Sequence, residues 1–544
     1  MFRSHFVRRF FPLATAAAVA FLLAGCTPHS DQVAENAKSK TDKDKTEVTP
    51  SKEGKTGAAS EPAKDGNKTK KDGPTDPAKD GGIDVADLKE NKKEKTSPPV
   101  LPDPPIKQPE PEKDGKGKDK DKKGDPVVPV VVQAPPIAPG VTAKDIDKAI
   151  ERGVEYLKKT QRQDGSWGGE RFALGYACLA GLALLECKVP AKDPMIQKIA
   201  DVVRNAGGQL EDTYQASLAV LFLDKLIAEK AGDAGDAQRI QLLALRIASG
   251  QMNNGGWTYS FERLSTAEAG RHYGYLKTYY PWSTQAPRPK TAHEDKQDKK
   301  GGKGREIDLN NLPVDQLVWK AKLPREGFAP PPLGFGDNSN TQFALLALWT
   351  GRRYDVPAEC PILLAYQRFR ATQNGDGGWG YKLPNPNGGG DETGTTNTMT
   401  CAGLLGLALG SGAVPAGSNT GDKDKIQEPV SRGLATLGGF IGTPAPSLEA
   451  KLPMQNMYFL WSVERVGVLY DLKTIGGKDW YGWGAQILIK NQHDDGHWRG
   501  TDYPAASEHL DTCFALLFLK RANLVADLTE NLRIRMPIRD PGAK

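Results

Sequence analysis

Polar side chains open several strongly apolar segments of this chain, and they are its first candidates for chemistry. Carboxylates and amides at such positions would form a rim able to hydrogen-bond a ligand. The candidates for this rim are Asp212, Gln215, Asp337, Asn340, Gln342, Asn397 and Asp511. The same residue types cap the first turn of a helix, where backbone N–H groups lack partners and the dipole favours negative charge. The sequence leaves both roles open.

A metal site is the second possibility, and one short stretch suggests it. Asp511 and Cys513 flank Thr512, and His509 lies two residues before Asp511. All three are zinc ligand types, but ligands from a single helical turn cannot surround a tetrahedral ion. No Cys-x-x-Cys pair occurs in the chain. We expect no metal and no other cofactor, with Asp511 and Cys513 kept as weak candidates.

A repeated turn follows four amphipathic segments. It consists of a glutamine, a glycine four residues later and a tryptophan two residues after the glycine. The four copies are QRQDGSWGG, QMNNGGWTY, QNGDGGWGY and QHDDGHWRG, which begin at Gln161, Gln251, Gln373 and Gln492. A turn that recurs after helices is typical of repeat architectures, in which each unit packs on the next.

Apolar residues between these turns recur at helical spacing, and no run alternates as a strand would. Amphipathic helices are predicted at 145–161, 193–205, 236–250, 357–373, 424–440 and 476–491. More uniformly apolar helices are predicted at 172–185, 212–226, 340–350, 395–409, 454–469 and 510–522. A helix that is apolar on nearly every face is buried on nearly every face. The pattern therefore predicts six helical pairs in two concentric layers.

Two of the predicted pairs lack the repeated turn. Their connections read NAGGQLED after the second amphipathic helix and GGFIGTPAPS after the fifth. We interpret both as degenerate copies within a closed ring. The alternative is that only four pairs are real and that the helices form an open, linear solenoid.

The glutamine–glycine–tryptophan turns resemble the QW repeats of terpene cyclases of the squalene–hopene type. The β-subunits of protein prenyltransferases share the same toroid. The resemblance covers Val141 to Leu528 and implies an all-α fold, an α/α toroid of six helical hairpins with a central cavity. It also implies that each glutamine bonds across to a neighbouring repeat, while the tryptophan covers it and buries a large area.

The chemistry of these families does not carry over with the turn. The D-x-D-D motif that protonates an alkene is absent, and Asp494-Asp495 lies inside a turn on the outside of the predicted ring. The D-D-x-x-D diphosphate motif is absent too. Asp511 and Cys513 match half of the prenyltransferase zinc site, but the next apolar helix, 172–185, contains no histidine. Catalysis is therefore left open, and no catalytic residue is named.

Two classes of function follow. We expect a binding or scaffold module whose cavity takes an apolar or isoprenoid-like ligand, or whose ring binds an envelope protein. The alternative is an enzyme that uses residues outside these motifs, either a terpenoid cyclase or transferase or a polysaccharide lyase. A lyase would use NNGGWTYS (253–260) and the basic, aromatic stretch 271–282 on an acidic glycan.

The first residues predict export. A basic start and a short apolar stretch run directly into Leu23-Ala-Gly-Cys26, which resembles a bacterial lipoprotein signal cleaved before a lipidated cysteine. Thr27 follows instead of Asp, which implies the outer membrane. Several acyl chains on Cys26 would anchor the protein to the cell envelope. Five other cysteines remain, so disulfide pairing would leave at least one thiol.

Composition divides the 544 residues. Residues 1–25 are the predicted signal peptide, and residues 26–140 are a Lys-, Asp-, Pro- and Gly-rich tether that cannot bury a core. The toroid is predicted over 141–530, with a low-complexity insertion near 283–334 and a tail at 531–544. The net charge of +6 comes from 73 basic and 67 acidic residues without a basic, aromatic stripe, so no nucleic-acid partner is expected.

Overall fold

A computed structural model describes residues 138–168, 172–279, 307–323, 336–383, 393–414, 421–449, 452–501, 503, 506–535 and 537–542. These residues belong to the compact unit that contains Val132–Lys544. The predicted signal peptide, Cys26 and the tether up to residue 137 lie outside the described residues. Among the helices that are described, none is both long enough and apolar enough to cross a membrane.

The described residues are mainly helical, and their β structure consists of isolated bridges. The helices at the predicted amphipathic segments are α1 (Ala143–Thr160), α3 (Pro194–Ala206), α5 (Asp236–Ser249), α10 (Glu359–Ala371), α12 (Lys423–Phe440) and α14 (Trp480–Lys490). Helix α14 departs from the prediction, because every residue from Trp480 to Leu488 is buried. The uniformly apolar helices are α2 (Ala173–Glu186), α4 (Thr213–Ala228), α9 (Asn338–Gly351), α11 (Asn397–Ala413), α13 (Met457–Leu469) and α15 (Glu508–Lys520). The prediction of an all-helical fold is confirmed.

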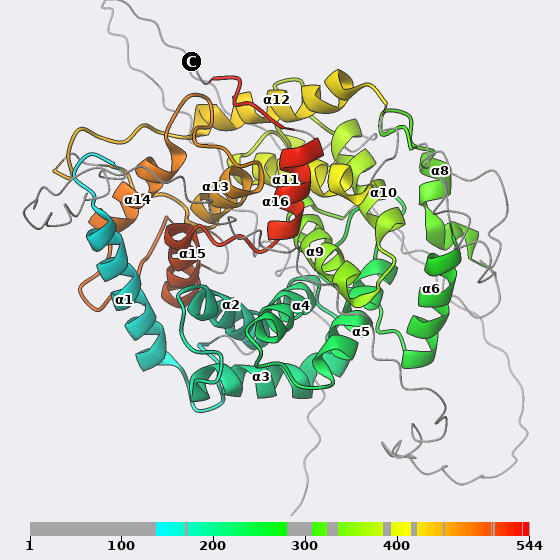
Figure 1. The fold of residues 1–544 in the computed structure, drawn as a ribbon, viewed down its shortest axis with the longest axis horizontal. Coiled ribbons are helices and arrows are strands. Elements are labelled where there is room, and N and C mark those ends of the chain that lie inside the picture. Colours follow the sequence, from blue (N-terminus) through cyan, green and yellow to red (C-terminus); the bar gives the residue numbers. More distant parts are fainter. Residues whose placement is uncertain are drawn as a thin grey trace, which may run out of the picture. The chain divides into compact units, whose positions relative to one another are not determined.

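The apolar helices form an inner ring (Figure 1). Going round it, α2 packs on α4, α4 on α9, α9 on α11, α11 on α13, α13 on α15, and α15 on α2 again. Helices α1, α3, α5, α10, α12 and α14 lie outside this ring (Figure 1). In α1 and α3 the buried residues are the apolar ones at helical spacing, such as Ile150, Val154 and Leu157 in α1. Because the last inner helix contacts the first, the open solenoid is excluded for the described helices.

Each repeated turn has the same hydrogen bonds. The glutamine Nε2 donates to the carbonyl of its own turn glycine and to a carbonyl of another outer helix. The outer-helix acceptors are Met195 for Gln161, Pro361 for Gln251, Pro429 for Gln373 and Ala149 for Gln492. The tryptophan Nε1 donates to a carbonyl ten residues earlier, near the end of the preceding helix. The expected bond from glutamine to a neighbouring repeat is therefore present in all four turns.

The turn glycine cannot be replaced without strain. Its φ is +82° in Gly165 and Gly255, +91° in Gly377 and +101° in Gly496, in the left-handed region that side chains disfavour. A Cβ on Gly255 would also lie 2.6 Å from the carbonyl oxygen of Leu364. Backbone conformation and close packing both require glycine here.

The fourth turn joins the two ends of the described ring. Gln492 donates to the carbonyl of Ala149 on α1 at 2.9 Å, and the Arg152 Nη2 donates to the carbonyl of His493 at 2.6 Å. Residues about 340 positions apart in sequence are thereby held together. The motif that links successive repeats also closes the circle.

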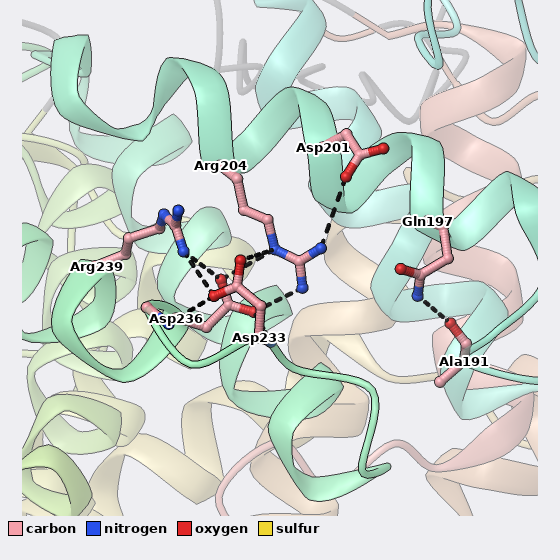
Figure 2. Close-up of polar contacts among 8 residues, drawn as sticks. Ala191, Gln197, Asp201, Arg204, Asp233, Asp236 and Arg239 are labelled. Carbon is pink, nitrogen blue, oxygen red and sulfur yellow. Dashed lines mark hydrogen bonds and ion pairs between the residues drawn. The ribbon is translucent and has the colours of Figure 1, made fainter. Parts of the chain in front are cut away.

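An ion-pair cluster replaces the motif at the first degenerate turn (Figure 2). Arg204, near the end of α3, donates from Nη2 to Asp236 at 2.8 Å and from Nε at 3.1 Å. Asp236 begins α5, is fully buried, and also accepts from Arg239 at 3.0 Å. Charge-assisted, bidentate bonds of this kind fix geometry as well as add stability. They tie α3 to α5 where no glutamine is available.

At the second degenerate turn, a glutamine from a different helix makes the stabilising hydrogen bonds. Gln486 on α14 is buried and accepts from the Ala445 N–H at 2.7 Å. Its Nε2 donates to the carbonyls of Ala445 at 3.0 Å and Pro139 at 2.9 Å. The loop after α12 is held by an amide, as in the four motif turns, but the amide comes from outside the loop.

Several short helices were not predicted: α6 (Thr266–Thr278), α8 (Val314–Leu317), η3 (Trp319–Lys322) and α16 (Ala526–Arg535). Helix α6 packs on α5, and α8 packs on α10 outside the ring (Figure 1). Helix α16 packs on α11 and α13, and its Asp527 accepts from the indole of Trp349 at 3.0 Å. Its packing continues past residue 530, since Leu532 is buried.

We predict that Gln251→Met lowers the free energy of unfolding by about 2–3 kcal/mol, because two buried carbonyls lose their donor. Gln251 is 3% exposed, and its bonds measure 3.1 and 2.8 Å. The matched control is Gln161→Met, whose bonds both measure 3.3 Å at a half-buried position, and it should cost about 1 kcal/mol. Urea unfolding measures the free energy of unfolding of both variants. Equal losses would contradict the claim that the buried hydrogen bonds of Gln251 contribute more to stability than those of Gln161.

We predict that His272 makes stability fall with acidification. His272 on α6 is buried edge-on to Trp319, and burial with nearby Lys320 lowers its pKa to about 4. The unfolded chain therefore binds a proton between pH 6.5 and 4 that the folded chain does not. Relative to His272→Phe, the wild type should lose roughly 2–3 kcal/mol between pH 7 and pH 4. Exposed His493→Phe is the control; a similar pH dependence in both variants would refute the prediction.

Candidate functional site

A pocket opens where the inner helices begin. Its empty volume is ≈ 630 Å³, including the part open to solvent. The first two turns of α2, α4, α9, α13 and α15 all contribute to its wall, together with Tyr259 from the turn that follows Gln251. The lining residues are Phe172, Gly175, Tyr176, Leu179, Tyr214, Gln215, Leu218, Tyr259, Phe343, Tyr458, Leu510 and Phe514. We name this the mouth pocket.

Aromatic rings from three inner helices fill the space beside the mouth pocket. Trp461 of α13 stacks on Phe514 of α15 at 4.9 Å between ring centroids and lies 5.9 Å from Phe343 of α9. Phe343 in turn meets Tyr214 edge-on at 5.0 Å. Aromatic side chains therefore fill part of the predicted central cavity, next to the mouth pocket.

The pocket wall has few hydrogen-bonding groups, and they differ in whether they have a hydrogen-bond partner within the protein. The Tyr458 hydroxyl is 2.9 Å from the Ser339 hydroxyl and accepts from Gln342. The Tyr259 and Tyr381 hydroxyls pair at 2.7 Å. By contrast, the buried hydroxyl of Tyr214 has no hydrogen-bond partner among the described residues. Burial raises the pKa of Tyr214 well above its usual value, so the group stays a neutral donor.

Asp212 and Asp337 act as helix caps in the structure. Asp212 accepts from the Gln215 N–H at 2.9 Å and starts α4. Asp337 is 4% exposed and accepts from the backbone N–H and side-chain Nδ2 of Asn340 at 2.7 and 2.8 Å. Burial raises the Asp337 pKa to about 6. Neither carboxylate lines the mouth pocket.

Of the remaining rim candidates, only Gln215 lines the pocket directly. Its Oε1 accepts from the Gly175 N–H at 3.3 Å, which ties α4 to α2. Gln342 reaches the pocket through Tyr458. Asn397 accepts from the Thr398 N–H at 2.7 Å at the start of α11. The predicted rim residues therefore have different roles in the structure. Some cap helices, some hold neighbouring segments together, and Gln215 alone lines the pocket.

Asp511 is a brace between the fourth turn and α15. It is fully buried and accepts from the Gly500 N–H at 2.9 Å and from the Tyr503 hydroxyl at 2.7 Å. The Arg499 Nη1 lies 3.5 Å from Oδ2, the oxygen that also accepts from the Gly500 N–H. These contacts occupy the carboxylate that the Asp-x-Cys pattern offers to a metal.

Cys513 is a free, buried thiol, and burial raises its pKa. A raised pKa disfavours the thiolate that binds metals. Among the described residues, no three His, Cys, Asp or Glu side chains are grouped so that they could hold a metal ion. No disulfide bond joins any of the five described cysteines.

Sequence reasoning missed the aromatic wall of the mouth pocket. Tyr214, Phe343, Tyr458 and Phe514 each lie in the first two turns of an inner helix. Their shared position near the starts of the predicted inner helices was visible in the sequence. The polar residues at the same positions were selected instead, because a helix cap and a ligand-binding group are the same residue types in a sequence.

Comparisons with known proteins give matches among solved structures. No protein-family model and no curated protein matches the sequence. Two similar solved structures are inactive variants of an α-1,6-mannanase from Salegentibacter sp., bound to α-1,6-mannotriose and α-1,6-mannotetrose. They cover 70% of this chain and 99% of theirs, at 11% and 10% identity and a TM-score of 0.40. A protein from Actinoplanes covers 69% of this chain and 98% of its own at 13% identity and a TM-score of 0.27.

These findings correct the expected function. The similar solved structures named above include mannanases, which act on carbohydrate, and not terpene cyclases or prenyltransferases. The expectation of a prenyltransferase- or cyclase-like binding or scaffold module was therefore wrong. At this level of similarity the mannanase activity is not transferred to the present chain.

We predict that Asp511→Ala costs about 2–4 kcal/mol of stability without changing ligand binding in the mouth pocket, since it leaves buried donors unpaired. Thermal and urea unfolding measure the loss. Gln215→Ala is the comparison: it should change binding more than stability, because Gln215 lines the pocket. Weaker binding by a fully folded Asp511→Ala variant would show that Asp511 is a ligand group.

Proposed function

We propose that the protein binds a carbohydrate in the mouth pocket. Tyrosines 176, 214, 259 and 458 stand in its wall, with Phe172, Phe343 and Phe514 between them. One face of a sugar ring consists of C–H groups that pack on an aromatic ring, while its edge carries hydroxyl groups. A wall that is largely aromatic but contains a few fixed polar groups suits such a two-sided ligand.

The observation that carries this proposal is the hydroxyl of Tyr214. A buried polar group without a hydrogen bond costs about 1–3 kcal/mol, so each one requires a reason. Tyr214 is 7% exposed and lines the pocket. The hydroxyl oxygen itself is enclosed by the pocket wall. A sugar hydroxyl that reaches it when neighbouring wall side chains move would accept from it and remove this cost, whereas a purely apolar ligand would leave the cost in place.

Cleavage of a glycosidic bond is the second candidate. It normally requires two carboxyl groups, one on each side of the bond. Among the described residues that line the mouth pocket, none is an aspartate or glutamate. The raised pKa of Asp337 would suit a general acid, but both of its oxygens accept from Asn340. Binding is therefore proposed ahead of cleavage.

Two finer expectations belong to the same proposal. The first is the arrangement of the ring as six hairpins with QW-type turns, which the glutamine and tryptophan hydrogen bonds support. The second is export with a lipid anchor on Cys26, for which the stretch Leu23–Cys26 is the support. A protein at the cell envelope would meet extracellular glycans.

We predict that Tyr214→Phe raises the Kd for an oligosaccharide three- to tenfold, the effect of about 0.5–1.5 kcal/mol for one neutral hydrogen bond. Titration calorimetry with a panel that includes α-1,6-mannotriose measures it. Tyr366→Phe is the matched control, since Tyr366 is also buried but lies on α10 outside the pocket. Failure of the whole panel to bind, or an unchanged Kd in Tyr214→Phe, would refute the proposal.

A further inference from the structure

The mouth pocket changes in character from its open side to its inner side. Four of its lining residues are half-buried: Phe172, Tyr176, Gln215 and Tyr259. The remaining lining residues are buried. Because partial exposure marks the side that faces solvent, the pocket has an outer part of aromatic and polar side chains in front of a buried part. We name these two parts the entrance and the interior.

The interior presents carbon atoms to a ligand. Leu179, Phe343 and Phe514 line it and are at most 4% exposed. Two tyrosines belong to the same buried wall, but their hydroxyl groups are not offered to the space. The hydroxyl of Tyr458 bonds to side chains of α9, and that of Tyr214 is enclosed by the wall. The surface that the pocket offers is therefore almost wholly carbon.

A sugar ring is poorly matched to this interior. Its hydroxyl groups would leave water for a carbon surface, and most of them would lose their hydrogen bonds. At the entrance the ring keeps contact with water, and its C–H face packs on Phe172 or Tyr176. The interior is then left for a part of the ligand that has no hydroxyl groups. A purely apolar ligand would fill the interior but would leave the polar entrance without a matching group.

We propose that the carbohydrate bound in the mouth pocket carries a short apolar substituent, an O-acyl or O-alkyl group, which fills the interior. This inference rests on the proposed carbohydrate binding and names the class of carbohydrate. The sugar ring lies at the entrance, and the substituent packs against Leu179, Leu218 and Phe514. The empty volume of ≈ 630 Å³, which includes the part open to solvent, has to hold both, so the substituent is limited to a few carbon atoms.

The test compares matched ligands on the full chain. The oligosaccharide panel that includes α-1,6-mannotriose is measured unmodified, after partial acetylation and after partial methylation. Equilibrium dialysis read by mass spectrometry gives the bound fraction of each modified product separately. Burying each apolar carbon of a substituent strengthens binding roughly fourfold. We therefore expect at least one modified product to bind at least fourfold more tightly than its unmodified parent.

Treatment of the ligands with alkali distinguishes the two kinds of substituent, because it removes acetyl groups and leaves methyl groups in place. A gain in affinity that alkali abolishes assigns an acyl group, and a gain that survives alkali assigns an alkyl group. Leu218→Asn tests the interior itself. Leu218 on α4 is 7% exposed and lines the pocket, so an amide in its place should reduce the preference for the modified ligand to less than twofold.

Leu210→Asn is the matched control, since Leu210 is 8% exposed and precedes α4 but does not line the pocket. It should keep the wild-type preference. If no carbohydrate binds, modified or not, the carbohydrate proposal fails and this inference falls with it. If the unmodified parents bind and no modified product binds more tightly, or if folded Leu218→Asn keeps the preference, only the inference about the substituent is overturned. If Leu218→Asn does not fold, the comparison of ligands on the wild type decides.

Discussion

The side-chain amide of a glutamine at the end of an outer helix holds this ring together. In each of four turns the amide donates both to the carbonyl of its turn glycine and to a carbonyl of another outer helix. One donor group thus fixes the local chain reversal and the position of a second helix. Where the motif is absent, Arg204 and Gln486 supply equivalent bonds. The inner helices can be almost wholly apolar because the outer layer carries these specific connections.

A closed ring of apolar helices has to fill its own centre. Here Phe343, Trp461 and Phe514 meet there, and protein interiors are packed too densely to leave a wide empty chamber. Space remains where the inner helices begin, as the mouth pocket. There the buried hydroxyl of Tyr214 lies among apolar residues without a hydrogen-bond partner among the described residues.

The polar residues at the starts of the inner helices show what distinguishes a helix-capping residue from a residue that lines a pocket. Asp337 and Asp511 looked like ligand groups by type, yet their oxygens accept from Asn340 and from Gly500 and Tyr503. Gln215 has the same kind of position but projects into the pocket wall. The difference lies in which neighbours approach each side chain, and those neighbours come from distant parts of the chain.

The sequence by itself determined the twelve helices of the two layers and the glutamine–glycine–tryptophan turns, because periodicity and turn chemistry are local. It also indicated the end of the ring where polar groups gather. It did not predict α6, α8 or α16, or the burial of nearly all of α14. Only the tertiary structure decided that α15 contacts α2, that Trp461 stacks on Phe514, and that the Tyr214 hydroxyl has no hydrogen-bond partner among the described residues. Ring closure and the satisfaction of a buried group depend on residues hundreds of positions apart, such as Ala149 and Gln492. No local pattern records which of them meet.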